Sequence, residues 1–222
     1  TPVLEITSSM DIGEHPGCNR GNLYILSNAD SVRMYKNDRF IKEYRPEMSP
    51  YKHLKHGPIL IDDFIGDALE KNERFRPKHA KEMADAMNIV ARGSLNHIPK
   101  RLYPTALKLA LLYHIDFAEV TKLYTKYIGD WGGTATVYRF DAIKNGKVIK
   151  SVTKEPVNGI RLQAEADHTN LTEHHSYDVA LVRIRAVDAH GNVLPFYQEP
   201  VRITAEGDIA IIGPDTLSLI HI

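Results

Sequence analysis

The chain has 222 residues, of which 43% are hydrophobic and 25% charged, ordinary values for a folded protein with a sizeable core. Its 28 basic and 28 acidic residues balance, so no overall field attracts nucleic acid or an anionic membrane, and we expect neither as a partner. Cys18 is the single cysteine, which excludes an internal disulfide and a cysteine-rich zinc site and favours a cytoplasmic over a secreted location.

Short strands are expected in the first part of the chain. Apolar, β-prone runs lie at Val3–Thr7, Leu23–Ser27, Val32–Lys36, Arg39–Tyr44 and Ile59–Ile61. The third and fourth runs flank Asn37 and Asp38, two residue types that tolerate a positive φ. This pair therefore predicts a tight hairpin.

The hydrophobic period becomes helical at about residue 67. Apolar residues recur on one face of a predicted helix at Ala80, Met83, Ala84, Met87, Val90 and Ala91. Pro77 suits the first turn of this helix, and Gly93 suits its end. A second helix is expected over Pro104–Tyr113.

A third helix is expected to begin at Asp116. Glu119 follows three residues later, which is the spacing of a capping box. Its apolar stripe comprises Val120, Leu123, Tyr124 and Tyr127. Gly129 is expected to end the helix.

Strands return after Gly132. Thr134–Ala142 and Lys147–Thr153 flank Asn145-Gly146, a strong hairpin signal. Further strand candidates lie at Ile160–Ala164, Val182–Ala186, Val201–Ala205 and Ile209–Ile212, with a turn cluster at Asp188–Asn192. Short strands separated by frequent turns are typical of a β-sandwich.

The expected fold class is mainly β with a helical insertion. We expect two immunoglobulin-like β-sandwich modules plus a helical block. Residues 1–66 and 132–156 would form the first sandwich, residues 67–131 the helical insertion, and residues 157–222 the second sandwich. In this layout the hairpin at Asn145-Gly146 joins the sheet begun before Gly66, while the completeness of the second sandwich stays open.

Histidines cluster around residue 170 without the spacing of a metal site. His174 and His175 are adjacent, with His168 upstream and Glu173 beside them. Adjacent residues on a strand point to opposite faces, which is poor geometry for a shared metal ion. We interpret them as solvated loop histidines, and we expect no metal-binding, cofactor-binding or catalytic residue in this chain.

Two further features bear on chemistry. Asp62 and Asp63 are neighbouring carboxylates that could serve acid–base or metal chemistry, but we favour a cap of the turn before Phe64. Trp131 is the candidate sugar contact, since an indole can stack on a sugar ring. We favour aromatic packing where the helical block meets the sheet as the simpler interpretation of Trp131, with Tyr124 and Tyr127 before it in the sequence.

Two blocks of sequence resemble one family. The stretch Ser27–Asn37 is similar to the segment after the catalytic barrel of glycoside hydrolase family 2 β-galactosidases, where Ser-Asn-Cys-Asp-x-Val-x-Leu-x-x-Asn-Gly is usual. Val182–Pro195 and the run from Val201 to Gly213 resemble the last immunoglobulin-like module of that family. Departures occur at Ala29, where Cys is common, and at Asp38, where Gly is common.

The resemblance implies a part of a retaining glycosidase, whose two catalytic carboxylates lie on a (β/α)₈ barrel. The chain lacks the strand–helix alternation of such a barrel and has strand-like sequence at both ends. We therefore expect the chain to be a non-catalytic C-terminal portion of a bacterial enzyme and to be inactive alone. Its expected role is to buttress the barrel, an oligomer contact or the rim of the substrate cleft. Its expected partners are the catalytic barrel of the same parent chain, a second copy in a homo-oligomer, and a carbohydrate.

Two alternatives stay open. A carbohydrate-binding β-sandwich module would use Trp131 against its ligand. A stand-alone immunoglobulin-like interaction protein would need no barrel in the same open reading frame.

Overall fold

The computed structural model describes residues 1–11, 19–93, 100–104, 107, 111, 116–129, 135–156 and 159–218. The chain divides into two compact units, Thr1–Pro156 and Val157–Ile222. The fold is mainly β with a helical insertion, as the hydrophobic pattern predicts.

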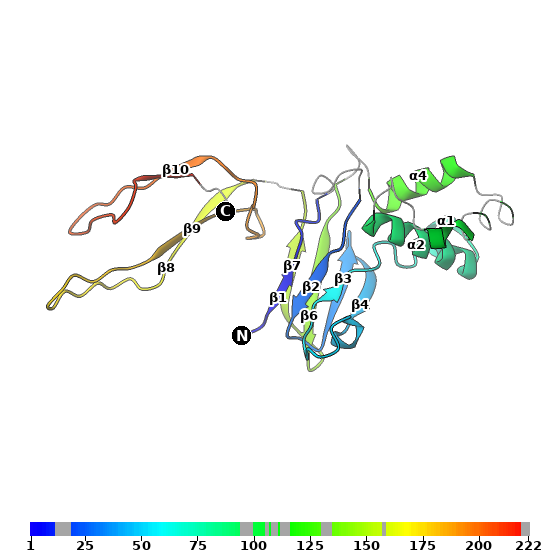
Figure 1. The fold of residues 1–222 in the computed structure, drawn as a ribbon, viewed down its shortest axis with the longest axis horizontal. Helices are drawn as coiled ribbons and strands as arrows, with labels where there is room; N and C mark the ends of the chain where they lie inside the picture. Colours follow the sequence, from blue (N-terminus) through cyan, green and yellow to red (C-terminus); the bar gives the residue numbers. More distant parts are fainter. Residues whose placement is uncertain are drawn as a thin grey trace. The chain divides into compact units, whose positions relative to one another are not determined.

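The first unit contains two antiparallel sheets, and Figure 1 shows their strands running side by side. The first sheet has the order β1 (Leu4–Ile6), β2 (Tyr24–Ser27) and β5 (Ile59–Leu60). The second has the order β4 (Arg39–Tyr44), β3 (Ser31–Lys36), β6 (Tyr138–Lys144) and β7 (Lys147–Lys154). After the helical insertion the chain returns to the sheet of β3, because β6 pairs with β3 and places Phe140 opposite Met34.

Both predicted hairpins are confirmed. Asn37 and Asp38 connect β3 to β4 with φ of 47° and 60°. Asn145 and Gly146 connect β6 to β7 with φ of 51° and 73°. Positive φ at both central residues matches the right-handed twist of the flanking strands, which explains why these residue types occupy the turns.

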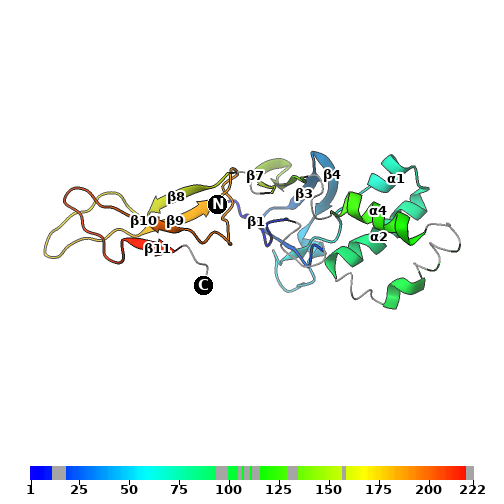
Figure 2. The ribbon, with the colours of Figure 1, turned by 90° about the horizontal axis from the view of Figure 1, so that it is seen from above.

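The helices of the insertion are α1 (Ala68–Glu73), α2 (Pro77–Arg92) and α4 (Phe117–Tyr127), and they gather on one side of the strands (Figures 1 and 2). Short 3₁₀ turns lie at Pro46–Met48 and Lys100–Leu102. Helix α2 has the predicted bounds, since Pro77 lies in its first turn and the amide of Gly93 closes its last. The second predicted helix, Pro104–Tyr113, falls largely outside the described residues.

The third predicted helix, α4, is confirmed with its cap. The Asp116 carboxylate accepts a hydrogen bond from the Glu119 amide at 2.7 Å. The chain leaves the helix at Gly129, whose φ is 131°. Its side chains Leu123, Tyr124 and Tyr127 are buried in the core.

One hydrophobic core unites the sheets and the helices of the first unit. It includes Leu4, Ile25 and Ile59 from the first sheet, Met34, Tyr138 and Phe140 from the second, and Met83, Met87 and Ile128 from the helical block. The helical insertion therefore buries its apolar face against the two sheets and shares their core.

The second unit consists of two short antiparallel ribbons. Strand β8 (Arg161–Ala166) pairs with β9 (Val182–Val187), and β10 (Pro200–Arg202) pairs with β11 (Thr216–Ser218). The predicted strand at Ile209–Ile212 is wrong. The pairing of Val201 with Leu217 leaves Ile209–Ile212 in the connection between the two strands, where it has no partner strand.

Candidate functional site

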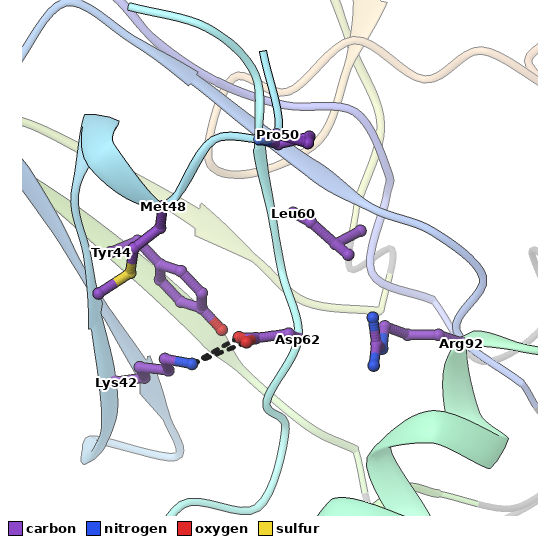
Figure 3. A pocket seen from close by; sticks show the side chains of 7 residues that line it. All are labelled: Lys42, Tyr44, Met48, Pro50, Leu60, Asp62 and Arg92. Carbon is purple, nitrogen blue, oxygen red and sulfur yellow. Dashed lines mark hydrogen bonds and ion pairs between the residues drawn. The ribbon is translucent and has the colours of Figure 1, made fainter. Parts of the chain in front are cut away.

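A cleft of about 410 Å³ opens in the first unit between β4, the segment around β5 and the end of α2 (Figure 3). Its lining combines charged and apolar side chains, namely Lys42, Tyr44, Met48, Pro50, Leu60, Asp62 and Arg92. Strand β4 supplies Lys42 and Tyr44, the 3₁₀ turn supplies Met48, and the last residue of α2 is Arg92. Residues from four separate segments therefore meet at this site.

Asp62 occupies the middle of the cleft. Both of its carboxylate oxygens lie 2.8 Å from Nζ of Lys42, and its side chain stays 43% exposed. Lys42 also lies over the ring of Tyr44, with Nζ at 5.4 Å from the ring centroid. This geometry fixes the carboxylate and leaves it accessible to a ligand.

Arg92 lies on the other side of Asp62 from Lys42 (Figure 3). Its Nε donates to the carbonyl of Asn88 at 3.3 Å, which orients the side chain along its own helix. Among the described residues no carboxylate pairs with this guanidinium, so its Nη groups remain available as hydrogen-bond donors.

Asp63 caps the turn that follows it. This confirms the prediction that the neighbouring carboxylates Asp62 and Asp63 include a turn cap. Oδ1 of Asp63 accepts hydrogen bonds from the amides of Ile65 and Gly66 and from Nδ2 of Asn88, each at 2.9 Å. Asn88 in turn accepts from the amide of Phe64 at 3.0 Å. This network binds the segment after β5 to α2 and so fixes the distance between the two walls of the cleft.

Sequence reasoning missed Asn88. The residue is 4% exposed and lies on the apolar face of α2 between Ala84 and Ala91. A polar residue on an apolar stripe is the one signal that could have revealed it, because buried amides are normally hydrogen-bonded.

Two groups near Asp62 have shifted pKa values. Burial raises the pKa of the Tyr44 hydroxyl well above its usual 10.0, and the charges of Asp62 and Asp63 act in the same direction. Burial likewise raises the pKa of Asp85 on α2; Asp62 and Asp63 add to the effect, while Lys81 and Lys42 oppose it. Acidic and basic side chains at and near the cleft are therefore equal in number, with Asp62, Asp63 and Asp85 against Lys42, Lys81 and Arg92.

Of the remaining residues considered from the sequence, the structure describes the histidines of the second unit. Trp131, the candidate sugar contact, lies outside the described residues, as does Cys18. Nδ1 of His168 lies 2.8 Å from the carboxylate of Asp167, whereas His174 and His175 are exposed. Within the described ranges, no three histidine, cysteine or acidic side chains come together in a way that could hold a metal ion.

Comparison with known proteins relates part of the chain to a curated protein. No family model matches the chain. None of the helices in the described residues has the length and apolar character to span a membrane. A β-galactosidase from Rhizobium radiobacter is 33% identical over 92 residues, which make up 40% of this chain and 65% of that protein, slightly under two thirds of its length. The chain is thus related in sequence to a glycoside hydrolase.

Proposed function

We propose that the chain is a non-catalytic C-terminal portion of a family 2 β-galactosidase-like enzyme and packs against other parts of it. In this role it buttresses the catalytic barrel, an oligomer contact or the rim of the substrate cleft. The similarity to a β-galactosidase supplies the enzyme class. The observation that carries the structural role is an exposed apolar face on the β8–β9 ribbon.

The two faces of this ribbon differ in chemistry. One face carries the cross-strand pairs Leu162–Ala186, Ala164–Ile184 and Ala166–Val182, all of them apolar. The other carries Gln163 opposite Arg185 and Glu165 opposite Arg183. Such alternation is typical of a ribbon with one face in water and the other against a packed layer.

The described residues of the second unit do not cover this apolar face completely. Leu162 is 49% exposed and Val182 is 53% exposed. A two-stranded ribbon is marginally stable in water and needs further strands or a packing partner. Covering each large apolar side chain would contribute about 1.5–3 kcal/mol, so this face favours a tightly packed neighbour.

The described sheets also favour a role beside a barrel over the barrel itself. A (β/α)₈ barrel is built from parallel strands, and a retaining site needs two carboxyl groups about 5–5.5 Å apart. Every strand pair in the described parts of this chain is antiparallel.

Activity of the purified chain gives the first test. On an aryl β-galactoside we expect no turnover above that of a mock preparation, while circular dichroism shows a folded β protein. Turnover that stays at constant specific activity through successive purification steps would overturn the proposal.

The second test places substitutions in the complete enzyme that carries this sequence. Leu162→Lys combined with Val182→Lys should reduce galactosidase activity and assembly, measured by size-exclusion chromatography. Gln163→Lys, on the opposite face of the same ribbon, is the matched control and should leave both unchanged. Equal behaviour of the apolar-face and control variants would contradict packing through this face.

A further inference from the structure

We propose that the cleft between β4, β5 and α2 binds a neutral saccharide through Asp62 and Arg92. This inference goes beyond the proposed function, because a buttressing part of an enzyme need bind no sugar of its own. It rests on residues other than Trp131, the residue that the sequence suggested as a sugar contact.

The size and lining of the cleft suit a small sugar. Its volume of about 410 Å³ is in the lower range of small-molecule sites, which favours a mono- or disaccharide over a long chain. Met48, Pro50 and Leu60 give one part of the lining an apolar surface. A pyranose ring presents both C–H surface and hydroxyl groups, so it matches a lining of mixed character.

Asp62 and Arg92 offer complementary hydrogen-bonding groups to hydroxyls. Each carboxylate oxygen of Asp62 accepts from Lys42 but keeps further acceptor capacity. Arg92 has donors left on its Nη groups. Because a hydroxyl both donates and accepts, adjacent hydroxyls of one ring can satisfy both side chains at once.

The charges at and around the cleft balance, so they favour neither an anionic nor a cationic ligand. The positive charge of Lys42 is paired with Asp62, which leaves Arg92 as the unpaired cation of the lining. Asp63 and Asp85 lie near this pair and add negative charge, and Lys81 adds a positive charge that offsets part of it. Because these charges offset one another, the cleft has no net charge to attract a phosphate or a uronate, and a neutral saccharide suits it.

The two polar residues are held in place before a ligand arrives. Asp62 directly precedes Asp63, whose carboxylate is fixed by Asn88, and the carbonyl of Asn88 accepts from Arg92. One buried residue therefore contacts both sides of the cleft, through its side-chain amide on one side and its backbone carbonyl on the other. Such preorganisation lowers the entropic cost of binding.

Ligand-observed saturation-transfer NMR on the full chain tests this inference, with methyl β-galactoside, methyl β-glucoside and lactose as probes. We expect saturable binding of at least one sugar, and about a tenfold or greater loss of affinity in Asp62→Asn and in Arg92→Ala. Arg45→Ala removes an exposed arginine outside the cleft and should bind like the unchanged chain. Thermal unfolding of each variant confirms that the fold is retained.

Three outcomes would overturn the inference. These are the absence of saturable binding for all three sugars, binding that both cleft substitutions leave unchanged, and binding that only Trp131→Ala abolishes. Competition by inorganic sulfate at low millimolar concentration would likewise count against it, because it would identify an anion site at Arg92.

Discussion

Arg20 donates a hydrogen bond from Nη2 to the carbonyl oxygen of Ile128 at 2.7 Å, across 108 positions of the sequence. Its Nη1 donates to the carbonyl of Met10 at 2.7 Å, and its backbone amide donates to the carbonyl of Ala91. Arg20 thereby holds the carboxyl ends of α2 and α4 against the segment that precedes β2. A cation is favoured there, because carbonyl groups concentrate negative potential at a helix carboxyl end.

Replacing Arg20 should destabilise the first unit strongly. The side chain is 3% exposed and lies over the ring of Tyr138 at 5.4 Å. Arg20→Met keeps an unbranched apolar stem but leaves two buried carbonyls without their donor, so we expect a loss of about 3 kcal/mol in the free energy of unfolding. Urea titration monitored by circular dichroism measures this loss of stability. Arg45→Ala, which removes a surface ion pair, should cost about 0.5 kcal/mol or less. Similar costs for both variants would refute this role of Arg20.

The neighbours Asp62 and Asp63 should differ in their contribution to stability. Asp63→Ala removes three hydrogen bonds at the turn and leaves the buried Asn88 amide without its acceptor, at an expected cost of about 2–3 kcal/mol. Asp62→Ala removes a partly exposed ion pair with Lys42 and should cost at most about 1 kcal/mol. Thermal and urea unfolding of the two single variants compare them directly. A larger cost for Asp62→Ala would contradict the assignment of the cap.

Local features of this fold were predictable from the sequence. The turn at Asn37 and Asp38, the turn at Asn145 and Gly146, and the cap at Asp116 each depend on residues within a few positions of one another. Positive φ and helix capping are properties of short segments, so residue type alone indicates them.

Features that depend on contacts between distant segments were not predictable in the same way. Arg20 and Asn88 acquire their roles from carbonyl and amide groups brought together by folding. The predicted strand at Ile209–Ile212 has the right residue types, yet a strand also needs a partner, and β10 pairs with Thr216–Ser218 instead. The cleft around Asp62 was missed for the same reason, because its lining comes from four separate segments.

Glu73 should make stability dependent on acid pH. Its Oε1 accepts from Nζ of Lys126 at 2.7 Å and from the hydroxyl of Tyr127 at 2.6 Å, joining α1 to α4. These bonds lower the pKa of Glu73 below its usual 4.5. A lowered folded-state pKa stabilises the protein above pH 4.5, and the contribution is lost as the pH falls below 4.5 through the lowered pKa.

The matched comparison for Glu73 is Glu73→Gln. At pH 7 we expect this variant to be about 1 kcal/mol less stable than the unchanged chain. The difference should shrink below pH 4.5, where protonation removes the charge of Glu73 from the unchanged chain as well. Urea unfolding at several values between pH 3 and pH 7 provides the measurement. A difference that stays constant over this range would exclude an ionic contribution of Glu73.

Two glycines with similar backbone conformations should tolerate alanine differently. Gly66 has a φ of 59°, and Gly146 has a φ of 73°. A Cβ on Gly66 would lie 3.2 Å from the carbonyl oxygen of Ile41, whereas a Cβ on Gly146 would meet no atom within 4 Å. Gly146→Ala should therefore lose only about 1–2 kcal/mol, the cost of holding alanine at a positive φ. Gly66→Ala should lose more stability, because crowding of the new Cβ adds to that cost.

Asparagine at the same two positions separates crowding from backbone strain. Asparagine adopts positive φ more readily than alanine, so Gly146→Asn should recover much of the stability lost in Gly146→Ala. Gly66→Asn should recover little, because its Cβ meets the same backbone atoms of Ile41. Urea unfolding of the four variants under one set of conditions decides the matter. If asparagine rescues both positions equally, the close approach of Ile41 to Gly66 does not limit substitution there, and the backbone conformation alone accounts for the need for glycine.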